Sequence, residues 1–264
     1  MKVIIFTSLL LLTSSFAGAQ RITWPEGKQL AISLSFDDGR VSQVKGGTAL
    51  LDKYGVKATF YVLPSAVESN LNGWKSAVAN GHEVGNHSMQ HPCSGNFLWA
   101  RDKALEMYSL EQMHKKLLEA NRQIERLLGV TPTSFAYPCG QTFVGKGTGT
   151  KSYVPVVAGT FATGRLWLSE APNDPLFCDF AQLTGIESDG KDFEAILPII
   201  EQAQKNNQWI VFAGHEIAES GSQTTRLSML EELLKYAADS RNGIWIAPVA
   251  TVATYVESQR KNTK

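Results

Sequence analysis

The chain has 264 residues, and its 25 basic and 25 acidic side chains give a formal net charge of zero. This balance gives no electrostatic reason to expect nucleic acid or an anionic membrane as a partner. The length suits one α/β barrel or two small domains. The chain has three cysteines, Cys93, Cys139 and Cys178. They allow three different single disulfides, and the sequence does not choose among them.

The first residues have the order of a secretory signal. Lys2 precedes an apolar run over residues 3–12, and small residues follow up to Ala19. The run is too short to span a bilayer, and no other stretch is apolar enough to do so. We therefore expect a signal peptide over residues 1–19, a mature domain over 20–264, a secreted or periplasmic location and no membrane insertion. Export also permits a disulfide.

Strand and helix patterns alternate along most of the chain. The first predicted elements are a strand at 29–36, a helix at 41–54 and a strand at 57–63. Later strands are predicted at 82–87, 133–138, 158–164, 208–215 and 243–249, and helices at 110–128 and 227–238. This alternation favours a parallel sheet, either closed as a barrel or open and doubly wound. In both folds the chemistry belongs at the carboxyl ends of the strands.

Polar side chains gather after these predicted strands. Asp37 and Asp38 follow the first strand, although such a pair alone is typical of a turn with two solvated acids. His87 and His91 form H-x-x-x-H, and on one helical turn both imidazoles could bind one metal ion. One aspartate would complete a His-His-Asp set. His215 follows an apolar strand and is either a proton donor or a core histidine.

Four motifs give the chain a family resemblance. SFDDG, HSMQH, FAYPCG and FAGH occur in the order and approximate spacing of the polysaccharide deacetylases, carbohydrate esterase family four, which the chain resembles over about residues 29–255. The resemblance implies a distorted, incomplete (β/α) barrel and a single catalytic domain. It also implies a secreted metal-dependent hydrolase that removes N- or O-linked acetyl groups from a poly- or oligosaccharide.

The resemblance assigns roles to five of these residues. Asp37 would be the general base and His215 the general acid. The ligands of a divalent metal, commonly zinc, would be Asp38, His87 and His91. The adjacent aspartates would thus divide their labour, since one fixes the metal and the other takes a proton from the attacking water.

The third and fourth motifs depart from the family pattern. Ala136 stands where many members carry an arginine that orients the base. The resemblance implies that the backbone N–H at Cys139 helps to hold the oxyanion, and we expect Tyr137 to lie at the substrate. Arg165 ends a predicted strand and could replace the missing arginine, the alternative being a solvated loop arginine. The fourth motif, an aspartate with a tryptophan, has no clear match, and the candidates are Arg165, Trp167 and Asp174.

Two other functions fit the same residues. One is hydrolysis of a non-sugar C–N bond on the same barrel, and the other is a catalytically silent, metal-keeping, carbohydrate-binding barrel. Two histidines receive no role, since we expect His82 to hold a turn and His114 to lie on a helix surface.

Overall fold

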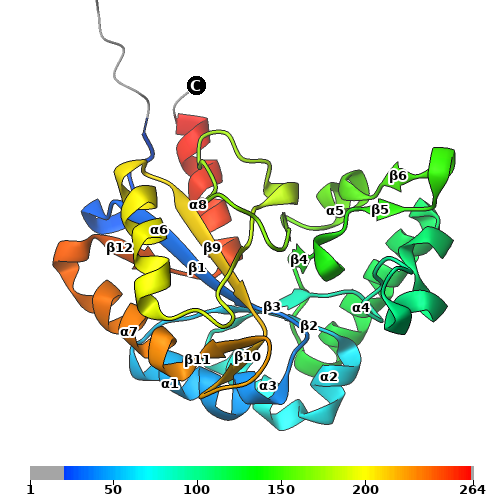
Figure 1. Ribbon diagram of the computed structural model, residues 1–264, viewed down its shortest axis with the longest axis horizontal. Coiled ribbons are helices and arrows are strands. Elements are labelled where there is room, and N and C mark those ends of the chain that lie inside the picture. Colours follow the sequence, from blue (N-terminus) through cyan, green and yellow to red (C-terminus); the bar gives the residue numbers. More distant parts are fainter. Residues whose placement is uncertain (1–20, 263–264) are drawn as a thin grey trace, which may run out of the picture.

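The computed structural model describes residues 21–262 (Figure 1), so the predicted signal peptide lies outside the described residues. One parallel sheet has the strand order β7-β4-β3-β2-β1-β9-β8, and β12 also pairs with β1. Its strands are β1 (Leu30–Phe36), β2 (Thr59–Val62), β3 (Glu83–Asn86), β4 (Ser134–Ala136), β7 (Thr163–Arg165), β8 (Ile186–Glu187), β9 (Trp209–Gly214) and β12 (Ile244–Ile246).

The central strand β1 is buried along its whole length. It pairs with β9, which is far away in the sequence but lies beside it in space (Figure 1). Leu30, Ile32, Leu34 and Phe36 belong to the main apolar core, whereas Ala31 faces a second core. Ser35, on the same side of the strand as Ala31, donates a hydrogen bond to the Phe212 carbonyl at 2.7 Å. The alternation predicted for this strand therefore separates two apolar layers.

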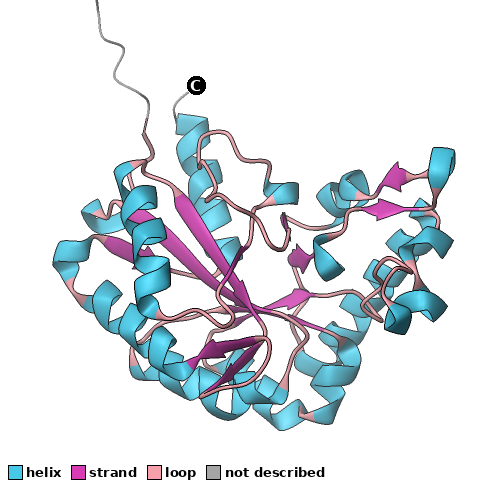
Figure 2. Cartoon of the chain, in the orientation of Figure 1, coloured by secondary structure: helices cyan, strands magenta, loops and turns pink. Residues whose placement is uncertain are grey.

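Helices lie outside the strands (Figure 2). They are α1 (Thr48–Lys53), α2 (Pro64–Ser69), α3 (Leu71–Ala79), α4 (Leu110–Leu128), α5 (Val154–Thr160), α6 (Phe193–Lys205), α7 (Leu227–Ala238) and α8 (Val249–Asn262). The helix predicted at 110–128 is confirmed as α4. It begins with a capping box between Ser109 and Gln112 and ends at Gly129, whose left-handed φ of 74° terminates it. Among the described residues, no helix combines the length and apolar character needed to cross a membrane.

Two predicted elements differ in the structure. The helix expected at 41–54 is present over 41–53, but Gln43–Gly47 within it form a π-helix before α1. The strand expected at 158–164 is wrong over most of its length, because 154–160 form α5 and only Thr163–Arg165 pair as β7. Pro155 near the start of α5 favours a helix there, since it lacks the N–H that a helix start leaves unpaired.

The sheet curls into the incomplete barrel that the resemblance implied. Leu183 forms a bridge with Arg165 at the end of β7, and β8 follows shortly and pairs with β9. The segment between these contacts therefore narrows the gap between the two ends of the sheet. Two small sheets lie beyond the barrel, β5 (Phe143–Val144) with β6 (Lys151–Ser152) and β10 (Glu216–Ala218) with β11 (Thr224–Arg226).

Candidate active site

The turn after β1 sends two adjacent carboxylates in different directions. The backbone N–H of Asp37 donates to the Gly214 carbonyl at 2.8 Å, which ties the end of β1 to β9. Asp38 and Gly39 then adopt left-handed φ values of 71° and 69°. Aspartate tolerates this region better than most residues, and glycine adopts it freely. The turn is therefore built from residues that can make it.

Asp37 forms a buried ion pair with Arg165. The Arg165 Nη2 donates to Asp37 Oδ1, and the two residues are 0% and 3% exposed. The prediction that Arg165 lies within salt-bridge reach of Asp37 is confirmed, and the alternative of a solvated arginine is wrong. Burial raises the pKa of Asp37, but the charges of Arg165, His87 and His215 together outweigh burial and hold that pKa below its usual range.

Asp38, His87 and His91 converge on one point. The Asp38 Oδ1 lies 3.5 Å from His87 Nε2 and 3.6 Å from His91 Nε2. The Nδ1 of His87 is 2.9 Å from the Ala136 carbonyl, to which it donates, so its Nε2 is free to accept a metal. This buried Nε2 has no hydrogen-bond partner among the described residues. An orphaned ring nitrogen within an Asp-His-His set fits a divalent metal.

The histidine pair lies on a loop, so the expected helical turn is wrong. Ser88 and His91 have left-handed φ values of 68° and 52°. Asn86 Oδ1 accepts from the Ser88 amide at 2.6 Å, and Ser88 Oγ accepts from the His91 amide at 2.9 Å. These side-chain turns bring the rings together, with centroids 4.7 Å apart. Burial lowers the pKa of His91 to about 4, and the neighbouring His87 adds to this, so His91 stays neutral and able to bind metal.

His215 is held by an aspartate that the sequence analysis missed. Its Nδ1 lies 2.7 Å from Asp189 Oδ2, and its amide donates to Asp189 Oδ1 at 3.1 Å. Thr225 Oγ1 also donates to Asp189 Oδ1 at 3.0 Å. A Cβ on Gly214 would lie 2.8 Å from this oxygen, so the glycine before His215 makes room for the carboxylate. These contacts leave the Nε2 of His215 as the nitrogen available for proton transfer.

Of the three candidates for the fourth motif, Trp167 lies beside His215 and Asp174 does not. The Trp167 and His215 rings pack edge to face with centroids 4.8 Å apart. Asp174 instead accepts from the Leu176 amide at 2.8 Å in its own turn. Asp189 follows β8, a strand of two residues that is too short to produce a periodic pattern. Only the pairing of β8 with β9 brings Asp189 to His215.

The residues of the third motif, FAYPCG, lie partly at the cavity and partly in the core. Cys139 lines the cavity and forms a disulfide with Cys93. No described residue accepts a hydrogen bond from the Cys139 amide, so this N–H is available to a ligand. The placement of Tyr137 at the substrate is wrong. Its side chain is buried among other aromatic rings, and its hydroxyl donates to the Ala181 carbonyl at 2.8 Å.

A second arginine, Arg40, was also missed. Its Nε and Nη2 donate to Asp38 Oδ2 at 3.0 and 2.9 Å, while Asp38 Oδ1 faces the histidines. Nη2 also donates to Gln223 Oε1 at 2.8 Å, and Nη1 lies 3.4 Å from Glu216 Oε1. Burial raises the pKa of Asp38, but His87 and Arg40 reverse this effect and keep that pKa well below its usual range. The two aspartates therefore have one arginine each.

A cavity of about 650 Å³ at the carboxyl ends of the strands is lined by members of each group, namely Asp37, Asp38, Arg40, His91, Cys139 and His215, whereas their buried partners His87, Arg165 and Asp189 do not line it. Its lining includes the polar Asp37, Asp38 and His215, and the exposed side chains of Phe97, Trp99 and Leu168 form an apolar part of its rim. Phe97 and Trp99 stack with centroids 5.6 Å apart and are 42% and 54% exposed, so they face solvent at the rim. The Trp99 ring lies 5.8 Å from His91. An open rim of this kind suits a ring-shaped, partly apolar ligand.

The two remaining histidines behave as expected. His82 accepts from the Ala58 amide at 3.2 Å and lies 3.3 Å from Asp52 Oδ1, so it holds the turn before β3. His114 lies exposed on α4. Neither contributes to the cavity.

The fold and the cavity define an incomplete (β/α) barrel with a candidate metal centre, and comparison with known proteins agrees on the fold. Residues 25–148 match the family model described as polysaccharide deacetylase. These residues, just under half of the chain, belong to the polysaccharide deacetylase family. The chain is 24% identical over 268 residues to a gellan lyase from Bacillus sp., covering 93% of this chain and 10% of that protein. It is 34% identical over 110 residues to the peptidoglycan-N-acetylglucosamine deacetylase PgdA of Listeria monocytogenes, covering 41% and 21%. The chain thus spans a small part of these relatives.

Solved structures share the fold at lower identity. A polysaccharide deacetylase candidate from Mycobacterium smegmatis superposes with a TM-score of 0.66 at 16% identity, covering 92% of this chain and 95% of that one. A family 4 acetyl xylan esterase from Clostridium thermocellum, in complex with a cobalt ion, gives 0.55 at 19% identity, covering 85% and 90%. The family therefore includes metal-binding barrels of the same architecture.

Proposed function

We propose that this protein is a metal-dependent deacetylase that hydrolyses an acetyl amide or ester on a carbohydrate. The observation that carries the proposal is the convergence of three units on one cavity. The Asp37–Arg165 pair supplies a base, the Asp38–His87–His91 cluster supplies metal ligands, and the His215–Asp189 pair supplies an acid. If these residues only stabilised the fold, they would not need to face the same cavity.

The proposed cofactor is a divalent cation, and zinc suits its ligands best. Two neutral imidazoles and one carboxylate are a common donor set of catalytic zinc sites, which keep a position open for water or substrate. Asp38 would bind through Oδ1, because Arg40 holds Oδ2. When bound, the cation would polarise the acetyl carbonyl and make water more acidic.

Asp37 is the proposed general base. A base works when its unprotonated form is available and it lies within hydrogen-bond reach of the proton it takes. The Arg165 guanidinium keeps Asp37 ionised and fixes one of its oxygens, which leaves the other oxygen for water. Asp37 would take a proton from the water as its oxygen attacks the acetyl carbonyl carbon. Arg165 thereby replaces the family arginine that is absent at Ala136.

The remaining groups act on the tetrahedral intermediate. The Cys139 N–H would donate to the oxyanion that forms from the acetyl oxygen. His215 would give a proton from Nε2 to the leaving nitrogen or oxygen as the carbon–heteroatom bond breaks, and Asp189 would stabilise the charged imidazole before that transfer. The products are acetic acid and a free amine or hydroxyl, and the site is reset when Asp37 releases its proton to solvent and His215 takes one up, so that water supplies all the hydrogen and oxygen added.

The rim supports a sugar as the group that carries the acetyl. Phe97, Trp99 and Trp167 line the cavity and offer faces and edges to the C–H groups of a pyranose, while Arg40 and Gln223 offer polar contacts. A small cyclic amide would leave most of this rim unused. The geometry serves an N-acetyl or an O-acetyl group equally, since both give a tetrahedral intermediate with the same oxyanion and differ only in the leaving atom.

We also propose that the protein is exported, so that it meets an extracellular or cell-wall polysaccharide. The signal-like order of residues 1–19 supports this, as does the Cys93–Cys139 disulfide, because such bonds persist in oxidising compartments. Fractionation of cells that produce the full chain tests the location.

Acetate release tests the activity directly. Purified protein is incubated with acetylated xylan, chitin oligomers and peptidoglycan, with and without a chelator, and acetate is measured. We expect release from at least one substrate that stops with chelation and returns with zinc. Metal binding without release from any of the three would favour the catalytically silent barrel, and release from a non-sugar amide alone would favour the other alternative.

A further inference from the structure

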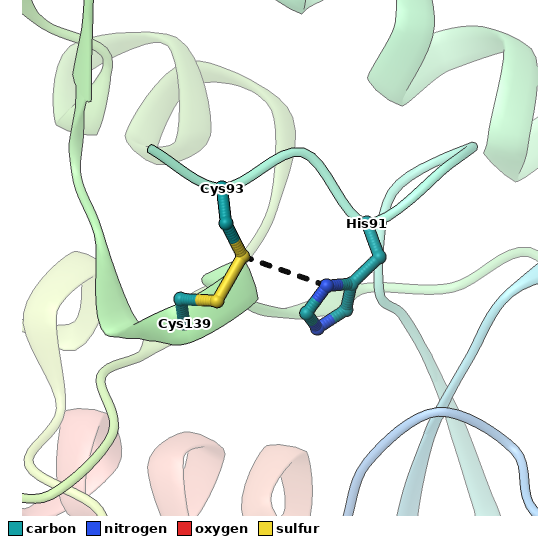
Figure 3. A group of neighbouring side chains, drawn as sticks. All are labelled: His91, Cys93 and Cys139. Atoms are coloured by element: carbon teal, nitrogen blue, oxygen red, sulfur yellow. Dashed lines mark hydrogen bonds between the residues drawn. A yellow bond between two sulfur atoms is a disulfide. The ribbon is translucent and has the colours of Figure 1, made fainter. Parts of the chain in front are cut away.

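The Cys93–Cys139 disulfide joins two segments of the site that come from different parts of the chain. Cys93 lies two residues after the metal-ligand candidate His91, and Cys139 supplies the proposed oxyanion N–H. Figure 3 shows the Cys93 sulfur between the His91 ring and the second cysteine. The separation of 46 residues means that no local structure holds these segments together.

The turn at Cys139 depends on contacts from outside itself. Cys139 has a left-handed φ of 54°, which is costly for a residue with a side chain and persists only where the surroundings impose it. A Cβ on Gly140 would lie 3.0 Å from Trp167, so the turn is packed against that segment on one side. On the other side, the disulfide and one hydrogen bond, from the Ser94 amide to Gln141 Oε1 at 2.7 Å, connect it to the metal-binding loop.

The metal-binding loop has its own supports. The Ser88 hydroxyl fixes the His91 amide, and the Ala136 carbonyl fixes the His87 ring. The disulfide contributes a weaker contact there, because Cys93 Sγ lies 3.5 Å from His91 Nδ1 and a disulfide sulfur can only accept. Loss of the disulfide should therefore displace the Cys139 turn more than the metal ligands.

We propose that the disulfide is a positioning element that holds the Cys139 N–H where the oxyanion forms. The inference rests on the proposed function, in which that N–H stabilises the intermediate. An oxyanion donor acts on the transition state more than on bound substrate. Displacing it lowers kcat and leaves KM and metal content nearly unchanged. Simple global stabilisation by the disulfide would instead change the melting temperature with no change in kcat of the folded protein.

The experiment compares the wild type, the double variant Cys93→Ala/Cys139→Ala and the control Cys178→Ala. Cys178 is the remaining cysteine, half-buried and away from the cavity, with its sulfur 3.2 Å from Arg260 Nη2. The wild type is also reduced with a phosphine, since a dithiol would bind metal. The phosphine breaks the S–S bond and becomes its oxide, while water supplies the oxygen and the two thiol protons. Thiol titration after denaturation counts free cysteines.

Three readouts are taken on each sample, namely kcat and KM, metal content, and amide hydrogen exchange over residues 137–142. We expect one free thiol in the wild type and a fall in kcat of about tenfold to a hundredfold, in both the double variant and the reduced wild type. KM and metal content should change by less than about threefold, and amides 137–142 should exchange faster. The Cys178→Ala variant should match the wild type.

Three results would overturn the proposal. They are three free thiols in the untreated protein, an unchanged kcat in the double variant, and a fall in kcat confined to the reduced wild type, which would point to the new thiols themselves. A failure of the proposed function is separate. If the wild type releases no acetate, thiol counts and exchange at 137–142 still show whether the bond holds the turn.

Discussion

Two neighbouring aspartates, Asp37 and Asp38, each meet an arginine, but the two regions are built differently. Arg165 comes from β7, 128 residues away, and its pair with Asp37 is sealed from solvent. Arg40 lies two residues after Asp38, and its side chain is 25% exposed. A charge in the interior interacts strongly and is hardly screened, whereas a partly exposed pair interacts weakly. The buried arginine can therefore control ionisation, and the exposed one mainly fixes direction.

This difference matches the proposed chemistry. A base must remain ionised and then accept a proton, so its pKa needs control by a permanent charge. A metal-ligating carboxylate is kept ionised by the cation itself and needs one oxygen aimed correctly. Four predictions test this division, and they follow from the largest expected effect to the smallest.

The largest effect comes from removing the metal site as a whole. His87→Ala deletes a buried ligand whose Nε2 lies 3.5 Å from Asp38 Oδ1. We expect loss of bound zinc and of essentially all turnover, as with exhaustive chelation. Elemental analysis and acetate release measure the two, and His114→Ala on the surface of α4 is the control. Full activity in a metal-free preparation would contradict the proposed cofactor.

The second prediction separates the two aspartates. Asp37→Asn should keep metal and lose about 10²- to 10⁴-fold in kcat, because an amide cannot accept the proton. Asp38→Asn should lower metal affinity, since an amide oxygen is a weaker ligand than a carboxylate. Metal titration of both variants decides the assignment. If Asp37→Asn lost the metal and Asp38→Asn retained it, the two roles would be exchanged.

The third prediction concerns the buried pair. The Arg165 guanidinium lowers the pKa of Asp37, so Arg165→Met should raise that pKa. The base is then protonated at a higher pH, and the acidic limb of the kcat/KM profile moves upward in pH, with kcat reduced about tenfold or more. Breaking a buried pair also costs about 3–5 kcal/mol, so circular dichroism must show folded protein at the assay temperature. An acidic limb at the wild-type pH would count against the role of Arg165.

The smallest effect is expected at Arg40. Arg40→Met frees Asp38 Oδ2 but leaves Oδ1 facing both histidines. We expect metal affinity to fall by up to about tenfold, with the acidic limb in place and kcat at saturating metal within about threefold of the wild type. Competition with a chelator of known affinity measures the first quantity. A shift of the acidic limb as large as that of Arg165→Met would remove the distinction between the two arginines.

Much of the fold could be predicted from local pattern. The strand at 29–36 and the helix at 110–128 appear where their periodicities place them, because each buries a continuous apolar stripe. The strand prediction at 158–164 failed because short elements contain too few residues to show a periodic hydrophobic pattern. β7 and β8 have three and two residues, and their pairing partners define them.

The sequence by itself determined which groups gather at the site. Side chains that directly follow the strands, such as Asp37, His87 and His215, must meet at one edge of a parallel sheet. It also determined that Arg165 could reach Asp37, since both end strands.

Only the tertiary structure decided the partners that complete these groups. Asp189 reaches His215 through the pairing of a two-residue strand, and Cys93 meets Cys139 across 46 residues. Tyr137 belongs to the FAYPCG motif, but its side chain points into the core, because its ring packs with Phe135 and Tyr153. The hydrophobic pattern of a segment indicates which of its own side chains are buried. The contacts between distant segments depend on how the sheet curls, and no single segment encodes that.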